Sequence, residues 1–415
     1  MNIVMKRKIV NRTKMVRGII FQLHFTMQAQ SETISIESGS VQLDEVNFQI
    51  DPRFELYNIV GLLIQDWPFS NGFDIRYKKE AQAYFSKYTS HPTVTNFKTF
   101  WMKSFNSIDA PVEFLLECEN TMIPKIPFND IRDTLAESLH QFMVDSEFES
   151  FFRSQSGFYE TILLTIKYNF SDFEERSRIA DYYGYELNSY TCILNILGRG
   201  NFGVRISQNN NYDSYICLQP TDVTGSMPVW ENSSRMYNLI WHELSHAYIN
   251  PLVDKYADIV DTYSYLYEPI QSSMSAQAYQ SWNTAVKEHM VRAVSTRLAA
   301  QKYGEDAAYL NHQRKEIGGR FIYIFNILEE LEEYEKQDVD FISYFPEILN
   351  SFNNIDTFDI DPLNQIVSKI REPKINAIPL LNSYPEYDEI AIVYPTNIPE
   401  KELEKNCLKA LRTSG

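Results

Sequence analysis

The chain carries one His-Glu-x-x-His motif, formed by His242, Glu243 and His246. Histidines four residues apart lie on the same side of a helix, one turn apart, so both side chains can reach one metal ion. The glutamate after the first histidine would then lie beside the open coordination position, where it can take a proton from a water molecule. The motif therefore predicts a zinc-dependent hydrolase with one Zn²⁺ per chain, His242 and His246 as ligands and Glu243 as general base.

The segment around the motif has the pattern of a helix with one buried face. Ser233 or Ser234 can cap its first turn, and neither Gly nor Pro occurs before Asn250-Pro251. The apolar residues that repeat at helical spacing and define the buried face are Met236, Ile240, Leu244 and Ala247. The motif residues project away from this face, as a metal-binding cleft requires. The alternative interpretation is a surface helix with two solvated histidines.

A catalytic zinc ion needs a third protein ligand and keeps a fourth position open. One large class supplies it as a histidine at position 252, after a glycine at 249. These positions hold Leu252 and Ile249, which exclude that class. A carboxylate from a later helix is the alternative. The residues that qualify are Asp254, Asp258, Asp261, Glu268 and Glu288, with His289 as an outsider.

Glu288 lies in residues 282–300, a stretch that is apolar around most of a helical circumference and is therefore expected to be buried. A buried carboxylate needs a partner, which a metal ion would supply. Arg292, one turn later, could orient Glu288 or bind a substrate carboxylate. The residues alone leave a second interpretation equally open, in which Glu288 and Arg292 form an ordinary surface ion pair.

Size and composition are typical of a globular protein with one or two domains and a sizeable core. The net charge of −17 disfavours binding to nucleic acid or to anionic membranes. After the N-terminal region the sequence contains no run of about 18 apolar residues, so we predict no membrane-spanning segment. Free buried thiols are the favoured interpretation of the four cysteines; Cys192 and Cys217, on neighbouring predicted strands, are the best candidates for a disulfide.

The first 30 residues have the order of an export signal. Basic residues from Lys6 to Arg17 precede a short apolar stretch, and a small residue, Ala29, precedes a polar segment. We therefore expect residues 1–30 to be a signal peptide and the protein to be exported, to the periplasm or the extracellular space. The alternative is an N-terminal arm that stays on the chain.

Helical patterns dominate the rest of the chain, so we predict an α+β fold that is mainly helical. Strands are predicted at residues 33–36, 46–50, 190–197, 201–207, 212–218 and 390–394. Helices are predicted from residue 52 and at 77–88, 110–119, 131–144, 148–168, 252–267, 276–303, 319–336 and 400–412. This divides the chain into a helical N-terminal region (31–170), a catalytic region (171–340) with a small sheet before the motif helix, and a helical and strand extension (341–415). Residues 31–340 could form one continuous domain.

Several short stretches resemble an uncharacterised family of exported bacterial proteins, known only as a domain of unknown function (family 4932) and predicted to be zincin-like. Spread over residues 45–340, they are residues 50–56, His91-Pro92, the motif, Asn250-Pro251, Glu288 with residues 291–293, and residues 321–323. The resemblance implies a gluzincin-type metallopeptidase with a zincin-like core and Glu288 as third zinc ligand. The chain departs from thermolysin-type enzymes at Arg292, where they carry an acidic residue, so the surroundings of the ligand must differ.

A peptide-bond hydrolase also needs a second donor for the developing oxyanion. Tyr323 is the preferred candidate, and its alternative is a core aromatic residue with a satisfied hydroxyl; the others are Tyr309, His312 and Arg292. The strand at 201–207, with Phe202 and Gly203, is either the sheet edge on which an extended substrate pairs or an ordinary strand.

We therefore expect a zinc metallopeptidase that acts on peptide or protein substrates. A zinc hydrolase of another amide or ester is a second possibility. A third, from a different class, is an exported peptide- or glycan-binding protein with a structural or degenerate metal site. Glu243 is required for turnover in the first two and for nothing in the third.

Overall fold

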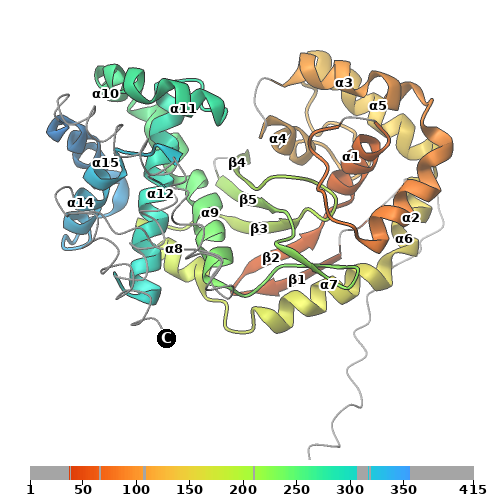
Figure 1. Ribbon diagram of the computed structural model, residues 1–415, viewed down its shortest axis with the longest axis horizontal. Coiled ribbons are helices and arrows are strands. Elements are labelled where there is room, and N and C mark those ends of the chain that lie inside the picture. Colours follow the sequence, from red (N-terminus) through yellow and green to blue (C-terminus); the bar gives the residue numbers. More distant parts are fainter. Residues whose placement is uncertain are drawn as a thin grey trace, which may run out of the picture. The chain divides into compact units, whose positions relative to one another are not determined.

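A mixed sheet of five strands lies at the centre of the computed structural model (Figure 1), in the order β1-β2-β3-β5-β4. The strands are β1 (Gly39–Leu43), β2 (Val46–Ile50), β3 (Ser189–Leu194), β4 (Phe202–Gln208) and β5 (Asn211–Leu218). The central strands β2, β3 and β5 run parallel, and each edge strand is antiparallel to its neighbour. The three strands predicted before the motif thus share one sheet with two strands from the start of the chain.

The structure describes residues 37, 39–64, 67–105, 109–208, 211–305, 316 and 319–355. The predicted signal peptide, the strands at 33–36 and 390–394, and the helix at 400–412 lie outside these residues. So do two of the oxyanion candidates, Tyr309 and His312.

Apart from α8, which lies against α9 (Ser234–Lys255) and α12 (Trp282–Tyr303), the helices between β2 and β3 are grouped on one side of the sheet in Figure 1, with α4 against β4 and α7 along β1. They are α1 (Pro52–Leu62), α2 (Arg76–Phe85), η1 (Ser86–Tyr88), α3 (Pro92–Ser104), α4 (Ala110–Leu116), α5 (Ile131–Asp145), α6 (Phe148–Ser154), α7 (Ser156–Asn169) and α8 (Glu175–Tyr183). The predicted helix at 148–168 is wrong in one respect, because it is broken at Gln155 into α6 and α7. We did not predict α3 or α8.

A second layer of helices follows the small hairpin of β6 (Asp222–Thr224) and β7 (Met227–Val229). It consists of α9 (Ser234–Lys255), α10 (Ala257–Thr262), η2 (Ser264–Ile270), α11 (Gln271–Ala276), α12 (Trp282–Tyr303), α14 (Ile324–Tyr334), α15 (Phe341–Asn350) and η3 (Ser351–Asn354). Figure 1 shows α9 beside the sheet and α12 on the side of α9 away from the sheet. The fold is therefore α+β and mainly helical, as predicted.

The course of α9 corrects another prediction. We expected the motif helix to end at Asn250-Pro251 and a new helix to cover 252–267, but α9 continues through Pro251 to Lys255. Proline removes one backbone donor and disfavours a helix interior without excluding it. Its neighbours Leu252 and Val253 are buried, so their packing supports the last turn of the helix.

The described cysteines, Cys118, Cys192 and Cys217, are buried free thiols, which confirms the favoured interpretation. Among the described helices, none is both long and apolar enough to cross a membrane.

The start of α1 is held by buried polar groups. Asp51 caps the helix by accepting from the Arg53 N–H at 2.9 Å, and Pro52 occupies the first helical position, as predicted. The Arg53 guanidinium donates to Asp51 and to the carbonyl of Cys118, tying α1 to the end of α4. Glu55, one turn into α1, is fully buried. Burial raises its pKa to about 8.

We predict that Glu55→Gln makes stability less dependent on pH. The pKa of Glu55 rises from 4.5 to about 8 on folding, so between these values the folded chain holds a proton that the unfolded chain has lost. The Glu55 contribution to the free energy of unfolding should fall by about 1.4 kcal/mol per pH unit across this window. Urea unfolding at pH 5 and pH 8 measures this: the variant should gain on the natural chain as pH rises, and a constant difference would contradict the prediction.

Candidate metal centre

The motif helix α9 is fixed by its buried face. Its first turn is capped by Ser233, whose Oγ accepts from the Met236 N–H at 3.3 Å. All four predicted face residues are 0–1 % exposed: Met236, Ile240, Leu244 and Ala247. Because this face is fixed, the imidazoles of His242 and His246 keep 17 % and 11 % of their side-chain surface exposed. Glu243 is more deeply buried, at 5 %.

Helix α12 packs against α9 and brings Glu288 to the two histidines. The Nε2 atom of His242 lies 3.7 Å from Oε2 of Glu288, and Nε2 of His246 lies 3.5 Å from Oε1. One ligand atom from each residue lies within 4.8 Å of the other two. Tetrahedral zinc with bonds of about 2.0–2.1 Å separates its ligands by about 3.4 Å. The group of His242, His246 and Glu288 could therefore hold a metal ion.

None of the other proposed ligands belongs to this group in the described part of the chain. The carboxylate of Asp254 pairs with Lys287 at 2.6 Å. His289 is fully buried and donates from Nδ1 to the carbonyl of Ala285 at 2.7 Å. Burial lowers the pKa of His289 to about 4. Of the candidates that the residues left open, the structure brings Glu288 alone to the histidines.

A second layer of side chains orients two of the three possible ligands, Glu288 and His246. The Arg292 guanidinium reaches Oε2 of Glu288 at 3.3 Å and Oε2 of Glu316 at 2.8 Å, and it lies 3.9 Å from the ring centroid of Phe321. Burial opposes the charge, but the two carboxylates more than offset it, so the pKa of Arg292 is raised. Of its two predicted roles, the structure favours orienting Glu288, because the guanidinium is already engaged by two glutamates. A direct contact with substrate has no support in this geometry.

Asn250 performs a comparable role for His246. Its Oδ1 lies 3.2 Å from Nδ1 of His246, one helical turn away. An amide oxygen can only accept, so Nδ1 carries the proton and Nε2 is left as the nitrogen that can bind a metal ion.

Three residues of this second layer were not assigned a role from the sequence. Asn250 could have been found from its spacing, four residues after His246. Nothing in the sequence singles out Glu316, which is 2 % exposed, or Tyr279, whose hydroxyl lies 3.5 Å from Nη2 of Arg292. Burial, followed by the charge of Glu288, raises the pKa of Tyr279.

The preferred oxyanion candidate is not brought to the site. Tyr323 is 1 % exposed and donates its hydroxyl to the carbonyl of Leu266 at 2.7 Å. Its ring stacks on His289 at 5.5 Å. This packing corresponds to the alternative interpretation, a core aromatic residue with a satisfied hydroxyl.

Strand β4 is an edge strand and contacts the motif helix through its backbone. A Cβ atom at Gly203 would lie 1.8 Å from the carbonyl oxygen of Glu243, so only glycine permits this approach. Residue 203 therefore fixes the distance between the sheet edge and the backbone of Glu243. The predicted contact of Gly203 with substrate would have to use the backbone.

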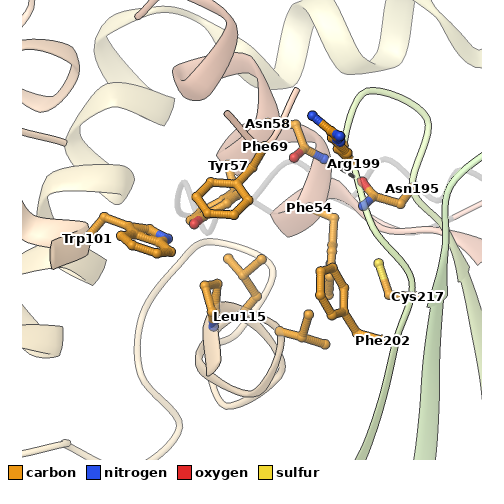
Figure 2. Close-up of a pocket in the computed structure, with 13 residues that line it drawn as sticks. Phe54, Tyr57, Asn58, Phe69, Trp101, Leu115, Asn195, Arg199, Phe202 and Cys217 are labelled. Carbon is orange, nitrogen blue, oxygen red and sulfur yellow. Dashed lines mark hydrogen bonds between the residues drawn. The ribbon is translucent and has the colours of Figure 1, made fainter. Parts of the chain in front are cut away.

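The side chain of Phe202 faces a small cavity of about 40 Å³ that Figure 2 shows in close-up. The cavity is lined mainly by aromatic and aliphatic side chains, among them Phe54 from α1, with Asn58 and Arg199 at one end. This volume holds one or two water molecules and is too small for an aromatic ring. The predicted substrate contact of the Phe202 side chain would therefore need the cavity to open.

We predict that Gly203→Ala displaces β4 from α9. The added methyl group would overlap the Glu243 backbone, which should lower the free energy of unfolding by about 1–3 kcal/mol or more. Gly157→Ala is the matched control, because a Cβ at Gly157 meets nothing within 4 Å. It should be neutral or stabilise by up to about 1 kcal/mol. Equal denaturation midpoints for the two variants would show that the contact is absent.

We also predict one bound metal ion per chain. After dialysis against zinc, His246→Ala and Glu288→Ala should each bind at least tenfold more weakly, because each removes one of three ligands. Asp254→Ala, which removes an exposed carboxylate outside the group, should bind like the natural chain. Elemental analysis gives the stoichiometry, and full zinc content in Glu288→Ala would exclude that ligand.

Comparison with known proteins gives one match. No curated protein and no solved structure matches the chain. The family model described as a domain of unknown function (DUF4932) matches residues 129–351, more than half of the 415 residues. The matched region contains the motif, Glu288 and residues 321–323, but it begins after residues 50–56 and His91-Pro92, which we had also assigned to the resemblance. The chain belongs to the DUF4932 family.

Proposed function

We propose that this protein is a zinc-dependent metallopeptidase of the gluzincin type. The observation that carries the proposal is the approach of Glu288, on α12, to His242 and His246, at 3.7 and 3.5 Å. The two histidines lie on α9, which also holds Glu243. Two imidazole nitrogens and one carboxylate oxygen suit Zn²⁺ and leave a fourth position for a water molecule. The mixed sheet followed by the motif helix is consistent with a zincin-like core.

Zinc bound by these residues would lower the pKa of a water molecule and polarise the carbonyl group of the substrate. The chain itself supplies the proton transfer. Glu243 follows a ligand on the same helix, and we assign to it the removal of the proton from water and its return to the leaving amine. Arg292 and Asn250 keep Glu288 and His246 in position, so little rearrangement is needed when substrate binds.

The second oxyanion donor is best assigned to Tyr279 in place of Tyr323. The Tyr279 hydroxyl lies beside Arg292 and Glu288, whereas the Tyr323 hydroxyl is bonded within the core. A phenol at this position can donate a hydrogen bond to an oxygen that develops negative charge.

Strand β4 is the candidate surface for an extended peptide. It pairs with β5 on one side and is the last strand of the sheet in the described part of the chain. Edge strands bind peptides by adding a strand, with backbone hydrogen bonds giving affinity and alternate side chains giving specificity. We further propose that the protein is exported, which rests on the pattern of residues 1–30.

Glu243→Gln tests the proposal. It should lower peptide hydrolysis about 10²–10⁴-fold, because the amide cannot accept the proton, and it should leave zinc content unchanged. A peptide library is incubated with zinc-loaded full-length chain, and cleavage is followed by mass spectrometry. Glu160→Gln, the same change at an exposed position on α7, is the control. Cleavage by Glu243→Gln at the natural rate would exclude this role, and the absence of zinc-dependent cleavage by the natural chain would favour a binding protein.

A further inference from the structure

Tyr279 lies in a turn whose backbone conformation is strained. The turn ends α11: the Tyr279 N–H donates to the carbonyl of Met274 at 2.9 Å, and the Ala278 N–H donates to that of Ser275 at 3.1 Å. These two hydrogen bonds define a Schellman motif, in which the left-handed position is usually glycine. Here that position is Ala278, with a φ of 73°. A side chain disfavours this conformation, so the turn needs support from its surroundings.

Side chains tie the turn to two neighbouring segments. The hydroxyl of Tyr267, on η2, donates to the carbonyl of Tyr279 at 2.7 Å. The Oγ atom of Ser275 lies 3.3 Å from the same hydroxyl and can donate to it, because the proton of Tyr267 is already used. On the other side, Nε2 of Gln277 donates to the carbonyl of Gly319 at 2.8 Å. The turn is therefore held between η2 and the segment that precedes α14.

The segment that precedes α14 contains a second strained position beside the same site. Arg320 has a φ of 69°, and Phe321 follows it. The ring centroid of Phe321 lies 3.9 Å from the guanidinium carbon of Arg292 and 5.9 Å from the ring centroid of Tyr279. Two left-handed residues thus flank one guanidinium, which reaches Oε2 of Glu288 at 3.3 Å. Strained backbone conformations cluster at functional sites, where the surrounding structure maintains them.

We propose that Tyr267 is a positioning residue for Tyr279; the inference rests on the proposed function, in which the Tyr279 hydroxyl is the second oxyanion donor. This hydroxyl lies 3.5 Å from Nη2 of Arg292 and beside Glu288, so it is next to the possible metal ligands. Without the hydroxyl of Tyr267, the carbonyl of Tyr279 loses its donor and the strained turn can relax. The phenol then moves with the backbone. An oxyanion donor acts within about 2.7–3.1 Å, so a small displacement weakens its hydrogen bond.

Phosphinic peptides test this inference by binding, because their tetrahedral, negatively charged phosphinate replaces the scissile bond and resembles the transition state. A set of phosphinic tripeptides with varied side chains is screened on zinc-loaded full-length chain, and the tightest is kept. Its dissociation constant is measured for Tyr267→Phe, for Tyr279→Phe, for the double variant and for Tyr265→Phe, together with the zinc content of each. Tyr265, an exposed tyrosine on η2, is the matched control. The kcat and KM of any cleaved peptide are measured on the same variants.

We expect Tyr279→Phe to weaken phosphinate binding about tenfold or more, because a hydrogen bond to a charged group is lost. Tyr267→Phe should weaken it about three- to tenfold. The double variant should bind like Tyr279→Phe alone, because Tyr267 acts through the hydroxyl that is then absent. Values of kcat should fall in the same order with KM nearly unchanged. The control variant should match the natural chain, and zinc content should be the same in all of them.

A purely structural contribution of Tyr267 would weaken binding equally with and without the Tyr279 hydroxyl, so additive losses in the double variant would overturn the inference. Natural affinity and kcat in Tyr267→Phe would overturn it too. Natural affinity and kcat in Tyr279→Phe would remove the donor assignment and, with it, the inference. In these three cases the zinc peptidase itself stands. If the zinc-loaded natural chain neither binds a phosphinic peptide nor cleaves a peptide, the proposed function fails and the inference fails with it.

Discussion

The contact between β4 and α9 is the constraint on which the site depends. At Gly203 the strand approaches so closely that the carbonyl of Glu243 occupies the space of a side chain. A backbone-to-backbone contact leaves little freedom for the strand to slide along the helix, because interiors are close-packed. The sheet edge, Glu243 and the two motif histidines therefore behave as one rigid part. Of the three residues that could hold a metal ion, Glu288 is the one that this contact does not position.

The packing of α12 on α9 places Glu288, and its charge needs compensation. Glu288 and Glu316 share one guanidinium, that of Arg292, and all three side chains are at most 13 % exposed. Among the described residues, two buried carboxylates with one arginine leave a net negative charge, which is costly in a low-dielectric interior. The neighbouring imidazoles can remove this charge only by taking up a proton. A divalent cation between Glu288 and the histidines offsets it at neutral pH, so the second layer itself favours metal binding.

Local patterns predicted the parts of the site that lie within one helix. The cap at Ser233, the buried face of α9 and the spacing of the histidines all depend on residues a few positions apart. Glu288 could be proposed because a carboxylate in an apolar helix needs a partner, although the resemblance was needed to prefer it. Tyr279 and Glu316 could not be found this way, because they meet Arg292 from positions outside α12.

Features of the fold also differ in whether neighbouring residues or distant contacts determine them. The turn at Asp44 and Glu45, both with positive φ, pairs β1 with β2, but their position beside β3 depends on contacts about 140 residues apart in sequence. Pro251 signals a helix end locally, yet tertiary packing carries α9 past it. Where buried contacts stabilise a segment by more than its local propensity disfavours it, the local sequence pattern no longer predicts the structure.

Most of the described aromatic residues pack in the interior and do not line a binding groove. The sequence has 27 Tyr and 26 Phe, enough to suggest a binding groove, but many described rings pack on one another in the interior. Tyr57, Trp67, Phe97 and Trp101 form one such cluster in the helical layer. The cavity beside Phe202 is correspondingly small. Under the proposed function, recognition of a peptide at β4 would then depend on the strand backbone more than on aromatic contacts.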